Sequence, residues 1–360
     1  MSEFPGGLVA RADAGCPPSM GRRWRAVWRI GGGGLLVLSL LAMAVAFVWL
    51  NAPLQPYAPL SGLPADRVAL LALGDQGSGD LQQWRVGRGM ERAAEALGGI
   101  NLVMLLGDNF YGAPLSDTSD RAWALRFERV YWGAWLSHVP FFAVLGNHDY
   151  PKSADVELAY SREKKGSGRW QMPARFYTRD FGRAGERPLV RVVFLDSAAS
   201  RESLLQQAAF IQQAFSAPGP APVWRVVAAH HPLRDHGPDG QNQQLQEDLL
   251  PMLQRSGVDL FLSGHDHNQQ LIVRPGEPAW VISGGGGQRV NALDSAAHAD
   301  TLFAVARPGF SAVEFSAEQA RISSYDASGQ AESSFDWPRA CAGQPQGCLA
   351  AEQRGALAGR

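Results

Sequence analysis

The stretch Ser263-Gly264-His265-Asp266-His267-Asn268 decides the fold through the spacing of its two histidines. In extended backbone, side chains at i and i+2 point to the same side, so His265 and His267 can face one metal ion. Gly264 permits a tight turn at the end of the apolar run Val258-Asp259-Leu260-Phe261-Leu262. An H-x-H pair alone also occurs in ordinary surface turns, so its interpretation depends on the rest of the chain.

Four earlier apolar runs also end in side chains of the kinds that bind metal ions. These are Asp75 after Val68–Leu73, Asp108 and Tyr111 after Leu102–Leu106, Asn147 and His148 after Phe141–Leu145, and His230 after Val223–Ala229. A single aspartate at a strand end is more often a helix cap or turn residue, but five successive strand ends favour a shared site. In open α/β sheets, ligands gather at the carboxyl ends of the strands. We therefore expect these side chains to share one crevice.

The expected metal ligands are oxygen and imidazole donors without cysteine. They are Asp75, Asp108, Tyr111, Asn147, His230, His265 and His267. Such donors suit iron, manganese or zinc in a catalytic site rather than a structural zinc site built on cysteine. Seven ligands are too many for one such ion and suit two ions that share a carboxylate, about 3.5–4 Å apart.

The alternation of patterns along the chain predicts an α/β domain. Between Arg67 and Gln269, short apolar runs alternate with helical stretches at about 80–97, 120–137, 203–215 and 241–255. After Gln269 the sequence predicts strands without intervening helices. We interpret these strands as an antiparallel half of the same domain.

Taken in order, five motifs resemble those of the calcineurin-like metallophosphoesterases. They are Gly74-Asp75, Gly107-Asp108-Asn109-Phe110-Tyr111, Gly146-Asn147-His148-Asp149, Ala229-His230-His231-Pro232 and Gly264-His265-Asp266-His267. Tyr111, three residues after Asp108, looks like the metal-binding tyrosine of the purple acid phosphatases, above all of the tartrate-resistant acid phosphatase-like branch. The resemblance covers about residues 67–325. It implies a four-layer αββα sandwich, in which two mixed β-sheets are flanked by helices, over residues 67–338.

The same resemblance implies a role for each predicted site residue. A ferric ion would take Asp75, Tyr111, His267 and the bridging Asp108, and a divalent iron, zinc or manganese ion would take Asn147, His230, His265 and Asp108. Two further histidines would be catalytic: His148 would contact the substrate phosphate, and His236 would bind phosphate or protonate the leaving group. A metal-bound hydroxide would attack phosphorus.

Other polar residues near the motifs have simpler interpretations. His231 either lines the substrate pocket, where the similar branch has a tyrosine, or packs beside a ligand. We expect His138 and His298 to be structural or exposed. Asp266 points away from its two neighbouring histidines and is expected to anchor the turn.

The N-terminal part predicts export. The apolar segment 31–50, with Ser39 the single polar residue between Leu35 and Leu50, predicts a transmembrane signal-anchor helix. Five arginines lie in residues 1–30, so this segment is expected to be cytoplasmic and the catalytic domain extracytoplasmic, either periplasmic or extracellular. The alternative is a signal peptide cleaved near Ala42-Met43-Ala44, which would release a secreted enzyme.

The remaining segments carry less information. Residues 51–66 are expected to form a Pro-rich stalk and residues 339–360 a poorly ordered tail. Cys341 and Cys348 could form a disulfide in an oxidising compartment. A formal net charge of -1 does not favour nucleic acid as a partner, and nothing in the sequence indicates an obligate protein partner.

The sequence thus predicts an exported, membrane-anchored acid phosphatase that hydrolyses phosphate monoesters at a dinuclear Fe(III)–M(II) centre. Two alternatives stay open at this point. The same site could act on phosphodiesters or pyrophosphates, such as nucleotides or lipid head groups. A catalytically dead scaffold is disfavoured because every expected ligand position holds a competent residue.

Overall fold

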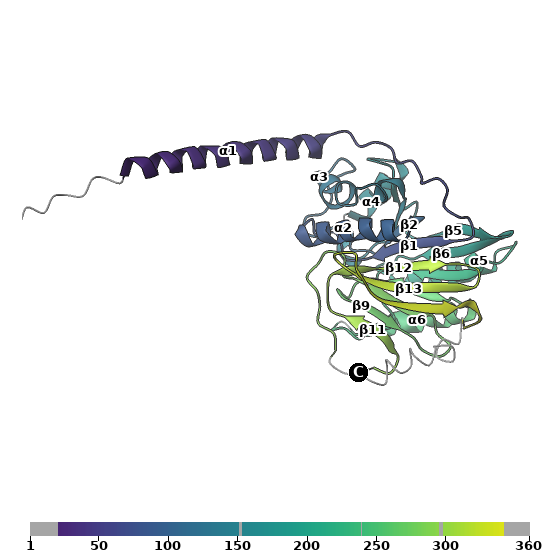
Figure 1. Ribbon diagram of the computed structural model, residues 1–360. Coiled ribbons are helices and arrows are strands. Elements are labelled where there is room, and N and C mark those ends of the chain that lie inside the picture. The colour runs from purple at the N-terminus through teal and green to yellow at the C-terminus, as the bar shows by residue number, and fades with distance from the viewer. Residues whose placement is uncertain (1–20, 151–152, 239, 295–297, 342–360) are drawn as a thin grey trace, which may run out of the picture. The chain divides into compact units, whose positions relative to one another are not determined.

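The computed structural model describes residues 21–150, 153–238, 240–294 and 298–341 (Figure 1). The chain consists of two compact units, Met1–Pro53 and Leu54–Arg360. The described part of the first unit is mainly helix α1 (Gly21–Asn51). The second unit holds both β-sheets and every predicted site residue.

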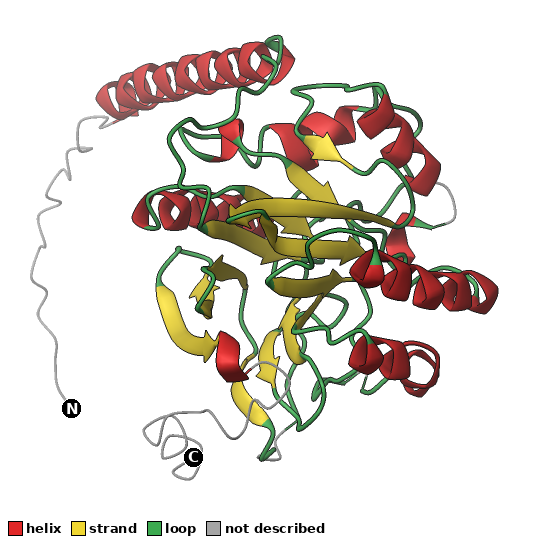
Figure 2. Cartoon of the chain, turned by 90° about the vertical axis from the view of Figure 1, so that its right-hand side faces the viewer, coloured by secondary structure: helices red, strands yellow, loops and turns green. Residues whose placement is uncertain are grey.

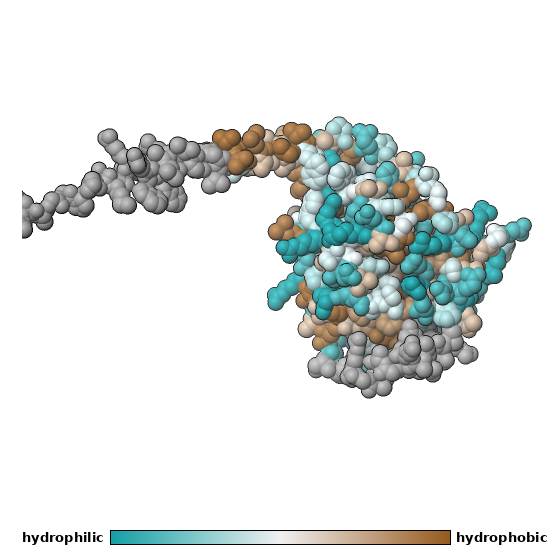
Figure 3. Space-filling model, in the orientation of Figure 1, coloured by the Kyte–Doolittle hydropathy of each residue, from teal (hydrophilic) through white to brown (hydrophobic). Residues whose placement is uncertain are grey.

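Helix α1 contains the predicted membrane segment. Apart from Ser39, its described side chains between Leu36 and Val48 are apolar, and all are exposed; the large apolar ones appear brown in Figure 3. Within the described residues, however, no helix combines the length and the apolar character that crossing a membrane requires. The predicted transmembrane helix over 31–50 is therefore not supported, and the apolar core from Leu35 to Leu50, which contains Ser39, is shorter than the roughly 20 residues of a typical span. Residues 1–20 of the predicted cytoplasmic segment lie outside the described residues.

The first sheet joins a parallel half to an antiparallel half. Strands β1 to β4 pair in parallel, and β12 to β14 continue the sheet antiparallel from the other side of β1. The order is β14 (Ala331–Pro338), β13 (Gln319–Asp326), β12 (Gly309–Phe315), β1 (Val68–Leu73), β2 (Leu102–Leu105), β3 (Phe141–Ala143) and β4 (Trp170–Gln171).

The second sheet has the same mixed character. Its central strands β6, β7, β8 and β10 are parallel, and β5, β9 and β11 pair antiparallel with their neighbours. The order is β11 (Thr301–Val305), β9 (Gln269–Ile272), β10 (Ala279–Ser283), β8 (Leu260–Ser263), β7 (Trp224–Ala228), β6 (Arg187–Phe194) and β5 (Tyr177–Ala184).

Side chains that alternate along one strand belong to two different hydrophobic cores. Along β6, Val190 and Val192 join the core shared with the first sheet, whereas Val193 joins a second core under α5 (Arg201–Ser216) and α6 (Gln243–Arg255). On the first sheet, α2 (Leu81–Ala96) contributes Val86 and Met90 to the shared core. Helices therefore lie on the outer sides of two packed sheets (Figure 2), and the predicted sandwich of two mixed sheets flanked by helices is confirmed.

Three of the four predicted helices are present as α2, α5 and α6, but the helix expected over 120–137 is broken. The chain there forms α3 (Arg121–Trp123), a π-helical turn η1 (Ala124–Glu128) and a 3₁₀ turn η2 (Leu136–His138). The reason is a tertiary contact: the Arg169 guanidinium donates to backbone carbonyls of this segment, including that of Leu136 at 2.8 Å. These carbonyls are satisfied without a continuous helix.

The sequence analysis did not identify several short elements. They are α4 (Ser153–Arg162), the 3₁₀ turn η3 (Asn147–Asp149), and strands β4, β5 and β14. The predicted stalk 51–66 is not free along its whole length. Within the second unit, the Tyr57 amide donates to the Ser167 carbonyl at 2.9 Å. Within the predicted tail, η4 (Arg339–Cys341) is described; Cys348 and the proposed disulfide lie outside the described residues.

A buried ion pair stabilises the broken segment. Arg169 Nη2 lies 3.0 Å from Glu128 Oε2, and their side chains are 2% and 0% exposed. Ser167 also donates to this carboxylate through its hydroxyl at 2.7 Å. Removing one member would leave a buried charge without its partner, which is costly in a low-dielectric interior.

We predict that Arg169→Met lowers the free energy of unfolding by about 3–5 kcal/mol, because Glu128 would remain buried and unpaired. Urea denaturation followed by circular dichroism measures this change. Arg321→Met is the matched control, since Arg321 and Asp336 are 48% and 46% exposed and such pairs contribute about 0–1 kcal/mol. Equal effects of both substitutions would contradict this assignment.

Candidate metal centre

The predicted site residues lie just beyond the carboxyl ends of parallel strands from both sheets. Asp75 and Asp108 follow β1 and β2, and Asn147 begins η3 after β3. His230 and His265 follow β7 and β8 in the second sheet. The strands themselves are buried and apolar, so the polar side chains become available only where each strand ends.

Three of these residues have unusual backbone conformations. The φ angles of Asp75, Asp108 and His265 are 60°, 54° and 70°, in the left-handed region that side chains with a Cβ rarely adopt. In the described part of the chain, Lys164 is the single other non-glycine residue with positive φ. Such strain persists where the surrounding structure enforces it, and it is concentrated at functional sites.

The first group of donor atoms surrounds the Tyr111 hydroxyl. Tyr111 Oη lies 3.2 Å from Asp75 Oδ1, 2.9 Å from Asp108 Oδ2 and 3.3 Å from His267 Nε2. Asp75 Oδ1 and His267 Nε2 are 3.5 Å apart. These four residues are the ones predicted to bind the first ion.

The second group surrounds the imidazole of His230. His230 Nε2 lies 3.0 Å from Asn147 Oδ1, 3.2 Å from His265 Nδ1 and 3.4 Å from Asp108 Oδ1. Asp108 therefore directs Oδ2 toward the first group and Oδ1 toward the second. This arrangement suits a carboxylate that is shared between two ions.

The donor set fits a pair of metal ions. The separations of 2.9–3.5 Å match the distances between neighbouring ligand atoms around an ion with bonds of roughly 2.0–2.2 Å. The Nδ1 of His230 lies 2.9 Å from the Leu106 carbonyl and that of His267 lies 2.9 Å from the Arg289 carbonyl, and a carbonyl can only accept. In the neutral imidazoles, both Nε2 lone pairs therefore face the carboxylates, and a cation would stabilise these facing lone pairs.

The local electrostatics also indicate a cation site. Burial, together with the charge of Asp108, raises the pKa of Asp75 to about 7. Burial lowers the pKa of His267, but the hydrogen bond and charge of Asp75 outweigh it and raise that pKa to about 9. Burial and neighbouring imidazoles hold the pKa of His230 well below its usual range. Without metal, protons thus occupy positions on Asp75 and His267 that an ion would take.

A buried carboxylate holds the loop that carries Asn147. Asp149 accepts hydrogen bonds from the backbone amides of Gly146 at 2.8 Å, Asn109 at 2.9 Å and Phe110 at 3.1 Å. Gly146 permits the close approach, because a Cβ there would lie 2.2 Å from Asp108 Oδ1. The 3₁₀ turn and the Asp108 turn are therefore held together as one rigid unit.

The two predicted catalytic histidines have different surroundings. The backbone amide of His148 donates to Asp108 Oδ1 at 2.8 Å, while its side chain, 54% exposed, lies tilted beside the Tyr111 ring with the ring centroids 4.6 Å apart. His236 belongs to a neighbouring cluster: its Nε2 lies 2.9 Å from Asp300 Oδ1, and its ring stacks on that of His298 at 3.6 Å. The structure thus brings His148 and the seven predicted ligands together, whereas the His236 side chain lies in a separate cluster with His298 and Asp300.

Sequence reasoning did not identify Ser197, whose side chain contacts the backbone of His230 and His231. Its hydroxyl oxygen accepts the backbone amides of His230 at 3.2 Å and His231 at 2.9 Å. Ser197 follows the apolar run Val190–Leu195, which ends in Asp196-Ser197. A polar side chain directly after an apolar run, the signal that identified the other site residues, is therefore also present at Ser197, although serine is not a usual metal ligand.

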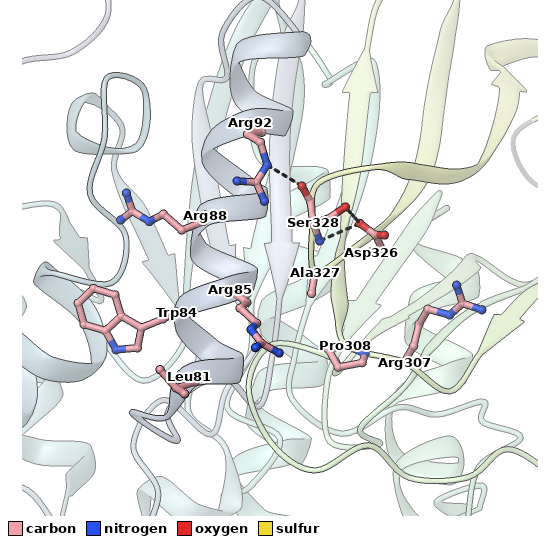
Figure 4. Close-up of a pocket in the computed structure, with 10 residues that line it drawn as sticks. All are labelled: Leu81, Trp84, Arg85, Arg88, Arg92, Arg307, Pro308, Asp326, Ala327 and Ser328. Carbon is pink, nitrogen blue, oxygen red and sulfur yellow. Dashed lines mark hydrogen bonds between the residues drawn. The ribbon is translucent and has the colours of Figure 1, made fainter. Parts of the chain in front are cut away.

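A separate hollow of about 650 Å³ lies beside α2 and contains none of the predicted site residues (Figure 4). Two of its arginines, Arg88 and Arg92, donate to backbone carbonyls, and Arg307 pairs with Glu332. Three of its four arginines therefore already have a hydrogen-bond or ion-pair partner within this unit.

The comparison with known families agrees with this geometry. The family model described as calcineurin-like phosphoesterase matches residues 72–269, more than half of the chain. The chain belongs to this family. The matched region contains all nine predicted site residues, and the phosphoesterase is accordingly a hydrolase.

Within this family, the curated relatives of the chain include acid phosphatases. The phosphoesterase is 29% identical to human tartrate-resistant acid phosphatase type 5 over 266 residues, covering 68% of this chain and 80% of that protein. It is 27% identical to purple acid phosphatase 4 of Arabidopsis thaliana over 288 residues, covering 76% and 84%. The predicted resemblance to purple acid phosphatases is confirmed.

Solved structures show the same fold. GAP50, the anchor in the inner membrane complex of Plasmodium, matches with a TM-score of 0.68 at 20% identity, over 76% of this chain and 89% of that one. Purple acid phosphatase PPD1 from yellow lupin seeds matches with a TM-score of 0.60 at 17% identity, over 77% and 55%. At these identities, both likenesses concern the fold alone.

We predict that the affinity of the metal-free phosphoesterase for Zn²⁺ falls as pH falls from 8 to 6. The ion must displace the proton of His267 below pH 9 and also that of Asp75 below pH 7, so the dependence should steepen from about tenfold per pH unit to more. Calorimetric titration in buffers of different ionisation heat counts the released protons. Asp75→Asn should flatten the whole dependence, because it removes the Asp75 proton and also the charge that raises the pKa of His267. A pH-independent affinity of the wild-type chain would contradict the prediction.

Proposed function

We propose that this chain is an acid phosphatase of the purple acid phosphatase type, which hydrolyses phosphate monoesters at a centre of two metal ions. The observation that carries the proposal is the position of Asp108, whose two carboxylate oxygens face two separate groups of donors at 2.9 and 3.4 Å. One carboxylate shared in this way suits two ions better than one. The names of the curated relatives support monoesters as substrates.

Tyr111 supports ferric iron as the first ion. Its hydroxyl lies between the carboxylates of Asp75 and Asp108, and burial with these two charges raises its pKa well above its usual range. A proton so strongly held leaves only when a highly charged cation replaces it, and a hard anionic oxygen favours the ferric state. Asn147, His230 and His265 would hold the second ion, a divalent iron, zinc or manganese.

When bound, a metal pair supplies Lewis acidity to the phosphoryl group and activates the attacking water. The chain's own residues then orient the substrate. His148 is exposed beside Tyr111, with its backbone anchored on Asp108, so its imidazole can donate to a phosphoryl oxygen. This places a hydrogen-bond donor at the open side of the centre.

We propose His236 as the group that protonates the leaving oxygen. Asp300 holds its Nε2, and burial lowers the pKa of His236 below its usual range despite this carboxylate. An acid with a lowered pKa keeps its proton only at acidic pH, so this contribution is present at low pH and lost as pH rises through that pKa. The assignment agrees with an acid phosphatase.

We predict that Asp108→Asn removes both ions and lowers hydrolysis of p-nitrophenyl phosphate by at least about a hundredfold, because each ion loses a charged ligand. Metal analysis of the purified chain and initial rates test this. Asp180→Asn, at an exposed ion pair with Arg191, is the control for the substitution itself. The bridging assignment would be wrong if one ion remained at full occupancy.

We predict that the iron-loaded protein is coloured by charge transfer from tyrosinate to iron, and that Tyr111→Phe bleaches it while iron stays bound through the remaining ligands. Absorption spectra and iron analysis measure both effects. Tyr325→Phe, a substitution in β13 outside the site, should leave the colour unchanged. A colourless but active wild-type protein without iron would indicate a metallophosphoesterase of another type.

We also propose that the N-terminal segment directs the domain out of the cytoplasm, as an anchor or as a cleaved signal. The arginines of residues 1–30 and the apolar residues that follow support this proposal. Fractionation of cells with N-terminal sequencing of the mature chain tests it. Recovery of the full chain solely in the cytoplasm would overturn it.

A further inference from the structure

We propose that the hollow beside α2 is a second binding site, which takes a free organic anion with an apolar chain, such as a fatty acid. The alkyl chain of this ligand would lie against Leu81, Trp84 and Pro308. Its carboxylate would bind the guanidinium of Arg85. The inference is independent of the proposed function, because none of the residues that line this hollow belongs to the metal centre (Figure 4).

The hollow has the dimensions of a small-molecule site. Its volume of about 650 Å³ falls within the range of roughly 300–1,000 Å³ that is usual for ligand pockets. It extends along α2 from Leu81 to Arg92, a stretch of about 16 Å at 1.5 Å per residue. The turn between β13 and β14 and the residues just before β12 form its other wall. A concave space of this length accommodates one extended alkyl chain, whereas a planar membrane surface would not reach into it.

Part of the lining is apolar and accessible to solvent. Leu81, the first residue of α2, is 76% exposed. Trp84 lies three residues later, on the same face of the helix, and is half-buried against the core shared by the two sheets. Pro308 and Ala327, both half-buried, line the opposite wall. An alkyl chain laid between these walls would remove apolar surface from water, which is the main source of affinity for apolar ligands.

Arg85 supplies the anchor for the anionic group. Its side chain is exposed and points from α2 toward Pro308 in Figure 4. Within the described residues, its guanidinium makes neither a hydrogen bond nor an ion pair, unlike the other three arginines of the hollow. A guanidinium presents its N–H donors as a planar fork that matches the two oxygens of a carboxylate.

Two further arginines of α2 add positive charge. Arg88 donates to the Val130 carbonyl at 3.0 Å, and Arg92 donates its Nε to the Ser328 carbonyl at 2.7 Å. A carbonyl carries no net charge, and in the described part of the chain neither arginine has a carboxylate partner. Both guanidinium groups therefore keep their charge uncompensated beside that of Arg85.

The acidic residues at this site do not cancel this excess. Glu332 pairs with Arg307, which removes the fourth arginine from the balance. The carboxylate of Asp326 accepts the backbone amides of Ser328 at 2.8 Å and Gln330 at 2.9 Å, so it is held within its own turn. Three arginines without a carboxylate partner against one aspartate leave the hollow positive. Its charge is complementary to that of an anion.

The combination of apolar lining and unpaired charge selects the class of ligand. A small inorganic anion bound at Arg85 would leave Leu81 and Trp84 exposed to water. A neutral lipid would cover the apolar surface but leave the guanidinium without a partner. An amphiphilic anion satisfies both parts of the site at once.

A series of ligands tests this class by calorimetric titration of the metal-loaded full chain, with hexanoate, octanoate and decanoate below their micellar concentrations. Each buried CH₂ group should raise the affinity about three- to fourfold. Decanol has the same chain without the charge and should bind at least about tenfold more weakly than decanoate. An affinity that does not depend on chain length, or equal binding of decanol and decanoate, would overturn the proposal.

Substitutions test the residues. Arg85→Gln should weaken decanoate binding about tenfold or more, and Leu81→Ser about threefold. Both side chains are exposed, so the free energy of unfolding should stay unchanged in urea denaturation. Arg179→Gln removes the same charge from an exposed position on β5 and should bind decanoate like the wild type. Equal affinity of Arg85→Gln and the wild type would overturn the proposal.

Photolabelling locates the ligand and separates this site from others. A decanoate with a diazirine at the end of its chain should, on irradiation, label peptides from α2 or from the opposite wall of the hollow, as identified by mass spectrometry. Label confined to residues 1–53 or to the metal centre would overturn the proposal. So would flotation with phosphatidylglycerol vesicles that Arg85→Gln abolishes, if free decanoate does not bind, because a bilayer would then be the partner of this face.

Discussion

Two carboxylates held side by side in a buried crevice are the constraint on which this structure depends. Asp75 and Asp108 are almost completely buried and both approach the Tyr111 hydroxyl within 3.2 Å. Within the described residues, their ionic partners are imidazoles rather than lysine or arginine. Two like charges in a low-dielectric site require compensation by protons or by cations. The site is therefore built to exchange protons for metal ions.

The fold holds this arrangement through apolar strands and strained turns. Parallel strands from two sheets end together, and each is buried along its length, so the turns cannot relax by shifting the strands. Positive φ angles at Asp75, Asp108 and His265 direct their side chains inward at a cost of about 1–3 kcal/mol each. Packing of the two cores and the hydrogen bonds of Asp149 offset that cost.

The second level of organisation is the position of hydrogen atoms on the imidazoles. The Nδ1 atoms of His230 and His267 each lie 2.9 Å from a backbone carbonyl, which can only accept. In the neutral imidazoles the Nε2 lone pairs therefore face the carboxylates of the site, the orientation that a metal ligand needs.

The sequence by itself determined the strand ends, the donor types and the resemblance that named the family, because strand periodicity and local spacing are written in neighbouring residues. Tertiary contacts decided the rest. Arg169 donates to carbonyls that a helix over 120–137 would have used, and Ser197, far from His230 and His231 in the chain, accepts both of their backbone amides. The sharing of Asp108 between two donor groups likewise exists only once both sheets are packed, since no local pattern records which oxygen faces which partner.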